Sequence, residues 1–218
     1  MERVLLSLFV GTVNEQCRFG IIATQNINEA LAALNGEARR DHEQRTAASE
    51  TLWLWLHTLL NSAANVSKVL FPADHRRLPD KRKTVEVEPA LEHRGELVRR
   101  FLQTDETSPL RTEERKLRNH LEHLDERLED WWITDPRHNI VRRMIGPLQG
   151  AIVGVPQGSI FEQYDPEQKA VAFRGDVYHL EPVVAELVRL HELTDPLMAT
   201  AWWDWDLPDD WPDPPSPQ

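Results

Sequence analysis

One sixteen-residue segment combines residue types that could handle a phosphate group. It runs over 117–132 and reads LRNHLEHLDERLEDWW. On a helix at about 100° per residue, its apolar side chains form one stripe: Leu117, Leu121, Leu124, Leu128 and Trp131. The opposite side carries polar side chains: Arg118, Asn119, Glu122 and His123. The pattern predicts an amphipathic helix over 112–132 that offers a cation and a titratable base on one face.

Arg118 and His123 suit phosphodiester chemistry. A guanidinium group supplies a fixed positive charge for a phosphate oxygen, and an imidazole titrates near neutral pH and can move a proton. RNA carries its own nucleophile, the 2′-OH, so neither a metal ion nor a protein nucleophile is needed. One helix offers one group of each kind. A second copy of this helix across a symmetric dimer would supply a second histidine, so that one histidine acts as the base and the other as the acid.

Two other interpretations of this face stay open. A charged helix face is often a solvated surface, with pairs such as Arg118–Glu122 and Glu122–Arg127. His120 and His123 could bind a metal ion, but their spacing lacks a third ligand nearby. No metal site is therefore expected, and inhibition by chelators would indicate the metal-dependent alternative.

The segment RNHLEH over 118–123 resembles the R-x4-6-H signature of the HEPN superfamily. The residues that follow it are similar to those of a HEPN family, and residues 63–72 resemble the end of an early bundle helix in HEPN-like proteins. The resemblance covers residues 20–135. It implies a mainly α-helical bundle that forms a homodimer with its motif helices face to face. It also implies a metal-independent endoribonuclease of the toxin or antiviral-defence type, with no cofactor and with an antitoxin protein as a partner.

The resemblance also implies a role for each polar residue. Arg118 would bind the scissile phosphate, and His123 would transfer the proton. Asn119 would orient the phosphate or His123, while Glu122 and Asp125 would position these groups. On the residues alone, Asn119 is equally a surface amide and Asp125 a surface ion-pair partner. The alternative function is a HEPN-like module that dimerises or binds without catalysis.

Further helices are expected around this segment. Apolar residues recur at three- and four-residue steps in three more ranges: 46–71, 91–103 and 181–193. Ser49 is the expected N-cap of the first of these. Another helix is expected to begin after Asn28 and to end at Gly36.

A proline-rich stretch over 73–90 is expected to form a loop that carries positive charge. Its basic side chains face a single acidic neighbour, Asp80: Arg76, Arg77, Lys81, Arg82 and Lys83. These side chains are predicted RNA contacts, because basic groups neutralise the phosphates of a nucleic acid. A solvated loop is the alternative.

The sequence pattern changes after residue 140. Residues 159–175 indicate a β-hairpin, with Pro166 in its turn and with Val171 and Phe173 alternating. We therefore predict three parts: a bundle over 1–140, a hairpin with a closing helix packed on the bundle over 141–200, and an acidic Trp- and Pro-rich tail over 201–218. The tail would fold back on its own domain, dock on a partner, or occupy the basic groove as an RNA mimic.

Composition limits the remaining possibilities. The 218 residues carry a net charge of −11, which argues against a protein that coats nucleic acid. It leaves room for a small basic groove, because five aspartates lie in the tail. The one cysteine, Cys17, fits a reducing cytoplasm and is expected to be buried. No apolar run reaches the roughly 18 residues of a membrane span, and Val4–Val10 lacks a signal-peptide cleavage pattern, so no membrane partner is expected.

Overall fold

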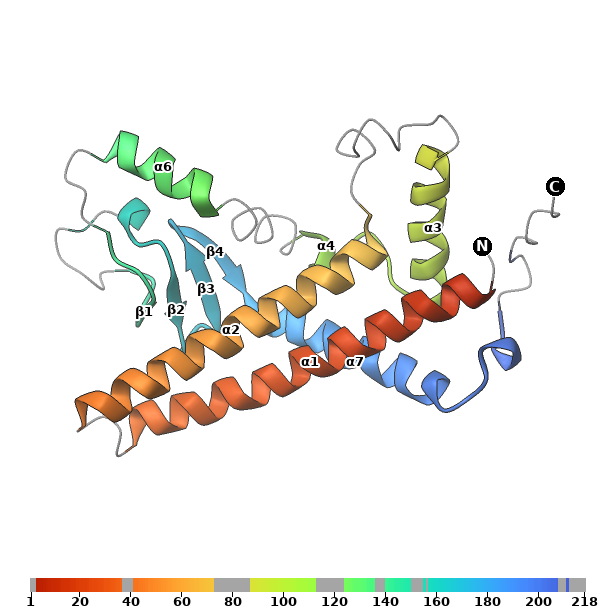
Figure 1. Ribbon diagram of the computed structural model, residues 1–218, viewed down its shortest axis with the longest axis horizontal. Helices are drawn as coiled ribbons and strands as arrows, with labels where there is room; N and C mark the ends of the chain where they lie inside the picture. Colours follow the sequence, from red (N-terminus) through yellow and green to blue (C-terminus); the bar gives the residue numbers. More distant parts are fainter. Residues whose placement is uncertain are drawn as a thin grey trace.

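Helices dominate the computed structural model, which describes residues 3–36, 41–72, 87–112, 124–135, 140–149, 155, 157–207 and 211. A small four-stranded sheet and a long helix follow in the C-terminal half of the described chain (Figure 1). The expected mainly α fold, with a late β region and a closing helix, is confirmed at this level.

Helix α1 spans Arg3–Asn35 without a break, so the helix start predicted after Asn28 is wrong. Buried apolar or small residues recur along it every three or four positions: Leu6, Val10, Val13, Cys17, Gly20, Ala23, Ile27 and Ala30. Its polar residues do not interrupt it, because Thr24 and Asn26 donate side-chain hydrogen bonds to the carbonyls four residues earlier. Gly36 follows its last turn, as expected.

Helix α2 spans His42–Leu70 and lies beside α1 in the opposite direction (Figure 1). It begins before the predicted range because its N-cap is Asp41, whose carboxylate accepts the Glu43 backbone N–H. Ser49, the predicted cap, lies inside the helix. The C-terminal boundary at Phe71 agrees with the prediction.

Helix α3 spans Val87–Phe101, so the expected loop over 73–90 ends earlier than predicted. Pro89 does not prevent this, because it lies in the first turn, where a backbone N–H has no partner within the helix. The remainder of the expected loop lies outside the described residues.

Two described helices overlap the predicted motif helix over 112–132. The short helix α4 is Pro109–Thr112, and α6 is Leu124–Thr134. Residues 113–123 lie outside the described part of the chain. The predicted helix is therefore observed over its C-terminal half, where it continues two residues beyond the predicted end.

The sheet has four short strands in the order β1-β2-β3-β4. Their bounds are Met144–Ile145, Gln163–Asp165, Ala170–Phe173 and Asp176–His179. Strands β2 and β3 form the predicted antiparallel hairpin, with Tyr164 opposite Val171. The pattern did not predict β1, which pairs parallel with β2, or β4, which pairs antiparallel with β3. Strand β1 has two residues, which are too few to show an alternation in sequence.

Both faces of β3 are covered. Val171 and Phe173 point into the main core, which agrees with the predicted alternation. Ala170 and Ala172 on the other face pack with Leu148 in a second apolar cluster. The strand is thus an internal one, whereas alternation of this kind usually marks a strand with one solvated face.

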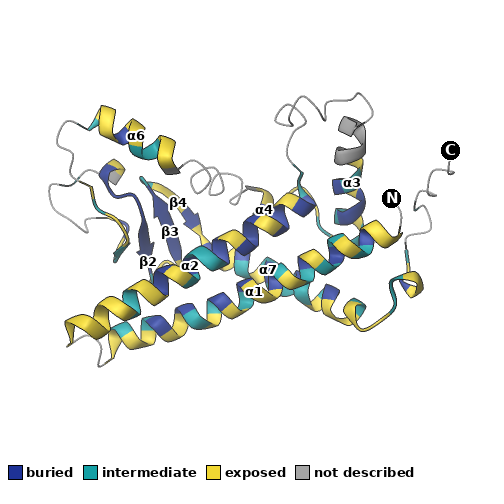
Figure 2. Ribbon diagram, viewed as in Figure 1, coloured by how far each residue is buried: buried dark blue, intermediate teal, exposed yellow. Residues whose placement is uncertain are grey.

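Helix α7, Leu180–Met198, is the predicted closing helix and packs on α1. The main core joins α1, α2, α7 and the sheet, and Figure 2 shows their buried residues on facing sides. Gly20 allows α7 and α2 to lie close to α1, since a Cβ atom there would lie 2.7 Å from Leu187 and 3.5 Å from Leu59. Among the described residues, no helix is both long and apolar enough to cross a membrane.

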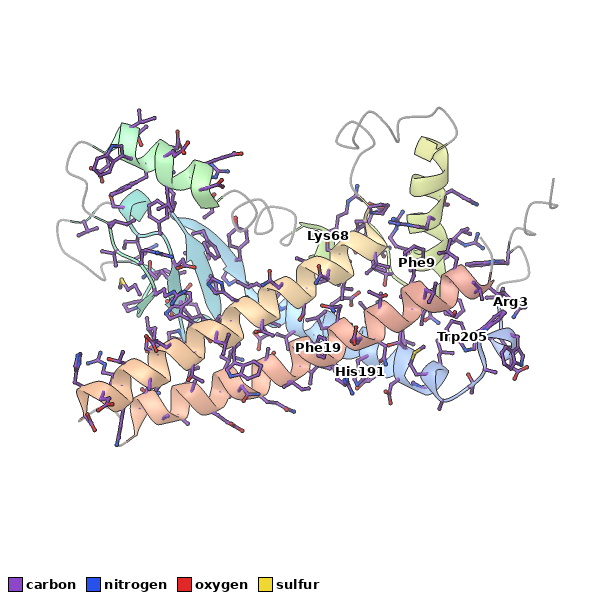
Figure 3. All side chains as sticks on the ribbon, in the orientation of Figure 1. Arg3, Phe9, Phe19, Lys68, His191 and Trp205 are labelled. Carbon is purple, nitrogen blue, oxygen red and sulfur yellow. The ribbon has the colours of Figure 1, made fainter. Side chains whose placement is uncertain are left out.

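The described part of the tail folds back on the ends of α1 and α3. It contains the short 3-10 helix Trp202–Asp204 and the buried Trp205, whose ring stacks on Phe101 at 5.7 Å. Arg3 donates hydrogen bonds to the carbonyls of Trp203 and Trp205, and Figure 3 shows Arg3 beside Trp205. The first of the three expectations for the tail therefore holds for these residues.

Candidate functional site

Most of the residues predicted for the site lie outside the described part of the chain. These are the motif residues Arg118, Asn119, Glu122 and His123, and the five basic residues of the 73–90 loop. Asp125 is described and is exposed in the first turn of α6. A carboxylate in this position is favourable, because the N-terminus of a helix carries a partial positive charge.

Helix α6 begins directly after His123, and its far end is tied to the region around the sheet. Trp131 is buried against Phe161, with the ring centroids 5.7 Å apart. Its Nε1–H donates to Asp135 at 3.2 Å, and the Ser159 hydroxyl donates to the same carboxylate oxygen at 2.6 Å. Arg174 adds a hydrogen bond of 3.2 Å to the Arg127 carbonyl. The continuation of the motif segment is thus fixed in orientation.

The last turn of α6 also carries an apolar surface. Ile133 is 82% exposed and Trp132 is 59% exposed. With three neighbours they line a shallow, almost wholly apolar hollow: Leu128, Glu129 and Trp131. Exposed apolar patches of this kind are one type of surface that proteins use to contact other molecules.

A polar cluster that the sequence analysis did not identify lies where α2 meets the sheet. Nε2 of His57, on α2, is 2.8 Å from Oε1 of Glu162, the residue before β2. Nη2 of Arg142 is 3.9 Å, and Nε of Arg143 is 3.7 Å, from Oε2 of the same carboxylate. We refer to these four residues as the His57 cluster.

Strand pairing brings the arginines beside Glu162. Val141 forms a parallel bridge with Ile160, and β1 continues this pairing with β2. The Met144 N–H donates to the Glu162 carbonyl at 2.8 Å, which sets the two segments in register. His57 reaches the same carboxylate from the helix that packs against this edge.

The backbone at Arg143 has an unusual conformation. Its φ of 55° lies in the left-handed region, which residues other than glycine rarely adopt. Consecutive side chains of a regular strand point to opposite sides, whereas Arg142 and Arg143 both approach Glu162. Trp53, one turn before His57, donates its Nε1–H to the Arg143 carbonyl at 3.2 Å and so ties this backbone to α2.

Burial and charge set the protonation of the cluster. The Glu162 side chain is 2% exposed, whereas His57 is 31% exposed. Burial acts to raise the pKa of Glu162, but the His57 hydrogen bond and the positive charges of His57, Arg143 and Arg142 outweigh it, so this pKa lies below its usual value. An ionised carboxylate only accepts hydrogen bonds, so Nε2 of His57 carries a proton in the contact with Glu162; in the neutral form of the ring, Nδ1 is then the acceptor.

The cluster can therefore hold an anion beside a hydrogen-bond acceptor. Its two guanidinium groups exceed its single carboxylate by one positive charge. No sequence motif indicates it, because His57 and Glu162 are 105 residues apart. The one local signal is a pair of arginines next to a short apolar strand. This pair alone does not indicate which carboxylate it faces.

Cys17 has no reactive character. It is buried in the α1 core, and burial, followed by the negative charge of Glu186, raises the pKa of its thiol to about 12. The expectation that it packs as an apolar side chain is confirmed. Among the described residues, no group of three or more His, Cys, Asp or Glu side chains is arranged to hold a metal ion.

Comparisons of the chain with protein-family models, with curated proteins and with solved structures gave no match. The chemistry of the motif segment and of the His57 cluster therefore carries the functional argument.

Proposed function

We propose that the protein is a metal-independent endoribonuclease of the toxin or antiviral-defence type that acts on RNA in the cytoplasm as a homodimer. Arg118 binds the scissile phosphate, and His123 moves the proton as the ribose 2′-OH attacks. Asn119 orients the phosphate or His123, while Glu122 and Asp125 position these groups. The bond from phosphorus to the 5′ oxygen breaks, and His123 of the second copy protonates that oxygen. The products are a 2′,3′-cyclic phosphate and a 5′-OH, and an antitoxin protein restrains the activity.

The observation that carries the proposal is the position of the motif segment directly before α6. Trp131 and Asp135 fix the C-terminal end of this helix, so the segment is followed by an element with a defined orientation. The exposed side chains of Trp132 and Ile133 supply an apolar surface on the same helix. An isologous contact through this surface would bring two copies of the segment toward each other.

Single substitutions test the chemistry directly. The full-length protein should cleave a mixed-sequence RNA, and should do so equally well with EDTA present. His123→Ala should lower the cleavage rate at least a hundredfold, since general acid–base catalysis contributes about 10² to 10⁴. Arg118→Ala should do the same, because the loss of one group that stabilises transition-state charge costs about 10² to 10³. Circular dichroism should show that both variants keep their helical content. His120→Ala, inside the same segment, is the matched control and should cleave at the parent rate.

The opposite results would reject the proposal. Cleavage by both variants at the parent rate would exclude Arg118 and His123 as the catalytic pair. Loss of activity with EDTA and with His120→Ala would instead support the metal-dependent alternative. A dimer that never cleaves RNA, as parent or variant, would favour the second candidate, a HEPN-like dimerisation module without catalysis, which the apolar surface of α6 equally supports.

A further inference from the structure

We propose that the His57 cluster is a separate site for the sugar–phosphate backbone of RNA. In this site Arg142 and Arg143 bind a phosphate oxygen, and Nδ1 of His57 accepts a hydrogen bond from a ribose 2′-OH. The proposal shares with the proposed function the assumption that RNA is the ligand. It uses none of the residues that would cleave the RNA.

Neither arginine uses its guanidinium N–H groups in a hydrogen bond to Glu162. Their nitrogen atoms lie 3.7 and 3.9 Å from Glu162, which is longer than a hydrogen bond. Both side chains are about half exposed, at 51% for Arg142 and 49% for Arg143. No described residue donates a hydrogen bond to Oε2 of Glu162, although this atom is buried. The guanidinium groups are thus oriented by the carboxylate without using their N–H groups on it, and these groups suit a phosphate.

His57 adds selectivity for a hydroxyl group. Glu162 holds the imidazole through Nε2, so the remaining nitrogen, Nδ1, is an acceptor in the neutral ring. The ribose 2′-OH is a donor that RNA has and DNA lacks. All three groups converge on one carboxylate, so a single nucleotide could contact the arginines and the imidazole together.

Backbone strain supports a ligand site over a simple ion pair. The left-handed conformation of Arg143 costs free energy, and strain of this kind concentrates at binding and catalytic sites. The hydrogen bond from Trp53 to the Arg143 carbonyl maintains it. A purely structural ion pair would gain most by closing to hydrogen-bond distance, which neither arginine does.

Binding of labelled oligonucleotides tests the proposal. All proteins would carry His123→Ala so that the probe stays intact. Fluorescence anisotropy would give the Kd for a fluorescein-labelled single-stranded RNA and for DNA of the same sequence, at one fixed salt concentration. The test variants are the double variant Arg142→Gln/Arg143→Gln and the single variant His57→Phe. The control is Arg45→Gln, which removes one positive charge, half of that removed by the double variant, from an exposed position on α2.

The double variant should raise the Kd for RNA at least tenfold, because each lost contact joins two charged groups. It should also reduce the dependence of binding on salt by about one ion per lost phosphate contact. Arg45→Gln should stay within twofold of the parent. His57→Phe should reduce the preference for RNA over DNA. Circular dichroism should show that the double variant keeps its helical content, so that a loss of binding is not a loss of the fold.

Several results would overturn this site. One is an RNA affinity of the double variant within twofold of the parent. Another is an equal loss of affinity in Arg45→Gln, which would indicate unspecific attraction of charge. If RNA cleavage still requires Arg118 and His123 in that case, the proposed function stands without this site. RNA binding that requires the cluster, in a protein that never cleaves, would support the site and reject the proposed function.

Discussion

At the scale of single residues, the His57 cluster depends on one buried carboxylate. Glu162 is almost fully buried, so its charge is tolerated only because His57 and two arginines face it. Its pKa is lower in the folded protein than in the unfolded chain, because these partners outweigh the effect of burial. The ionised carboxylate therefore contributes to stability.

This contribution has a definite pH dependence. A lowered pKa in the folded state adds stability that is fully present above the unfolded pKa of about 4.5 and is lost as the pH falls toward the folded pKa. The free energy of unfolding of the parent should therefore exceed that of Glu162→Gln at pH 7, and the difference should shrink below pH 4.5. Urea unfolding of both proteins between pH 7 and pH 3.5 would measure it.

The control for this prediction is Glu167→Gln, which removes an exposed carboxylate from the neighbouring turn. A difference between parent and Glu162→Gln that stays constant or grows toward low pH would contradict the assigned direction. So would an identical pH curve for the two substitutions, because it would mean that the cluster contributes nothing specific.

At the scale of elements, close approaches at glycines set how the helices dock. Gly95 on α3 is buried, and a Cβ atom there would lie 2.6 Å from the Pro72 ring and 3.1 Å from the Leu70 carbonyl. Neither a proline ring nor a backbone carbonyl can move aside easily. Gly11 on α1 has only the Met198 sulfur nearby, at 3.9 Å, which is an ordinary contact.

The same substitution should therefore have opposite effects at these two positions. Gly95→Ala should lower the free energy of unfolding by about 1–3 kcal/mol, the cost typical of overpacking. Gly11→Ala should leave it unchanged or raise it by up to about 1 kcal/mol, because alanine favours a helix interior. Chemical unfolding of both variants would measure the effect. Equal effects at the two positions would show that helix propensity, and not the docking of α3, decides.

At the scale of the whole molecule, the proposed dimer depends on the exposed end of α6. Ile133 and Trp132 expose large apolar surfaces on the helix that continues the motif segment. An isologous contact through this face would cover them. Leu54 on α2 is 62% exposed and offers a control at a distant site.

Charge placed on this face should prevent dimerisation. The parent should elute as a dimer in size-exclusion chromatography with light scattering, at twice the chain mass. Ile133→Glu should shift the protein to monomer and lower RNA cleavage in parallel, because burying a carboxylate without a partner is costly. Leu54→Glu should remain dimeric and active. A dimer that tolerates Ile133→Glu, or a monomeric parent, would exclude α6 as the interface.

Local patterns were sufficient for much of the fold. The period of apolar residues predicted α2, α3 and α7, and the turn at Pro166 with its flanking strands predicted the β2–β3 hairpin. The boundaries were less accurate. Asn28 and Ser49 are good capping residues, yet both lie inside longer helices. The core buries Ile27 and Ala30 beside Asn28, which outweighs its local preference. Ser49 is bypassed because Asp41 caps α2 two turns earlier.

The two candidate sites also differ in how far the sequence alone could predict them. The motif over 118–123 is local, so the sequence alone identified its residues and what they could do together. The His57 cluster is not local, because its members come from α2, the segment before β1 and the residue before β2. Only the parallel pairing of β1 with β2, the packing of α2 against that edge, and the left-handed turn at Arg143 bring them together. Contacts between residues far apart in sequence leave no periodic signal, so the tertiary structure alone decided them.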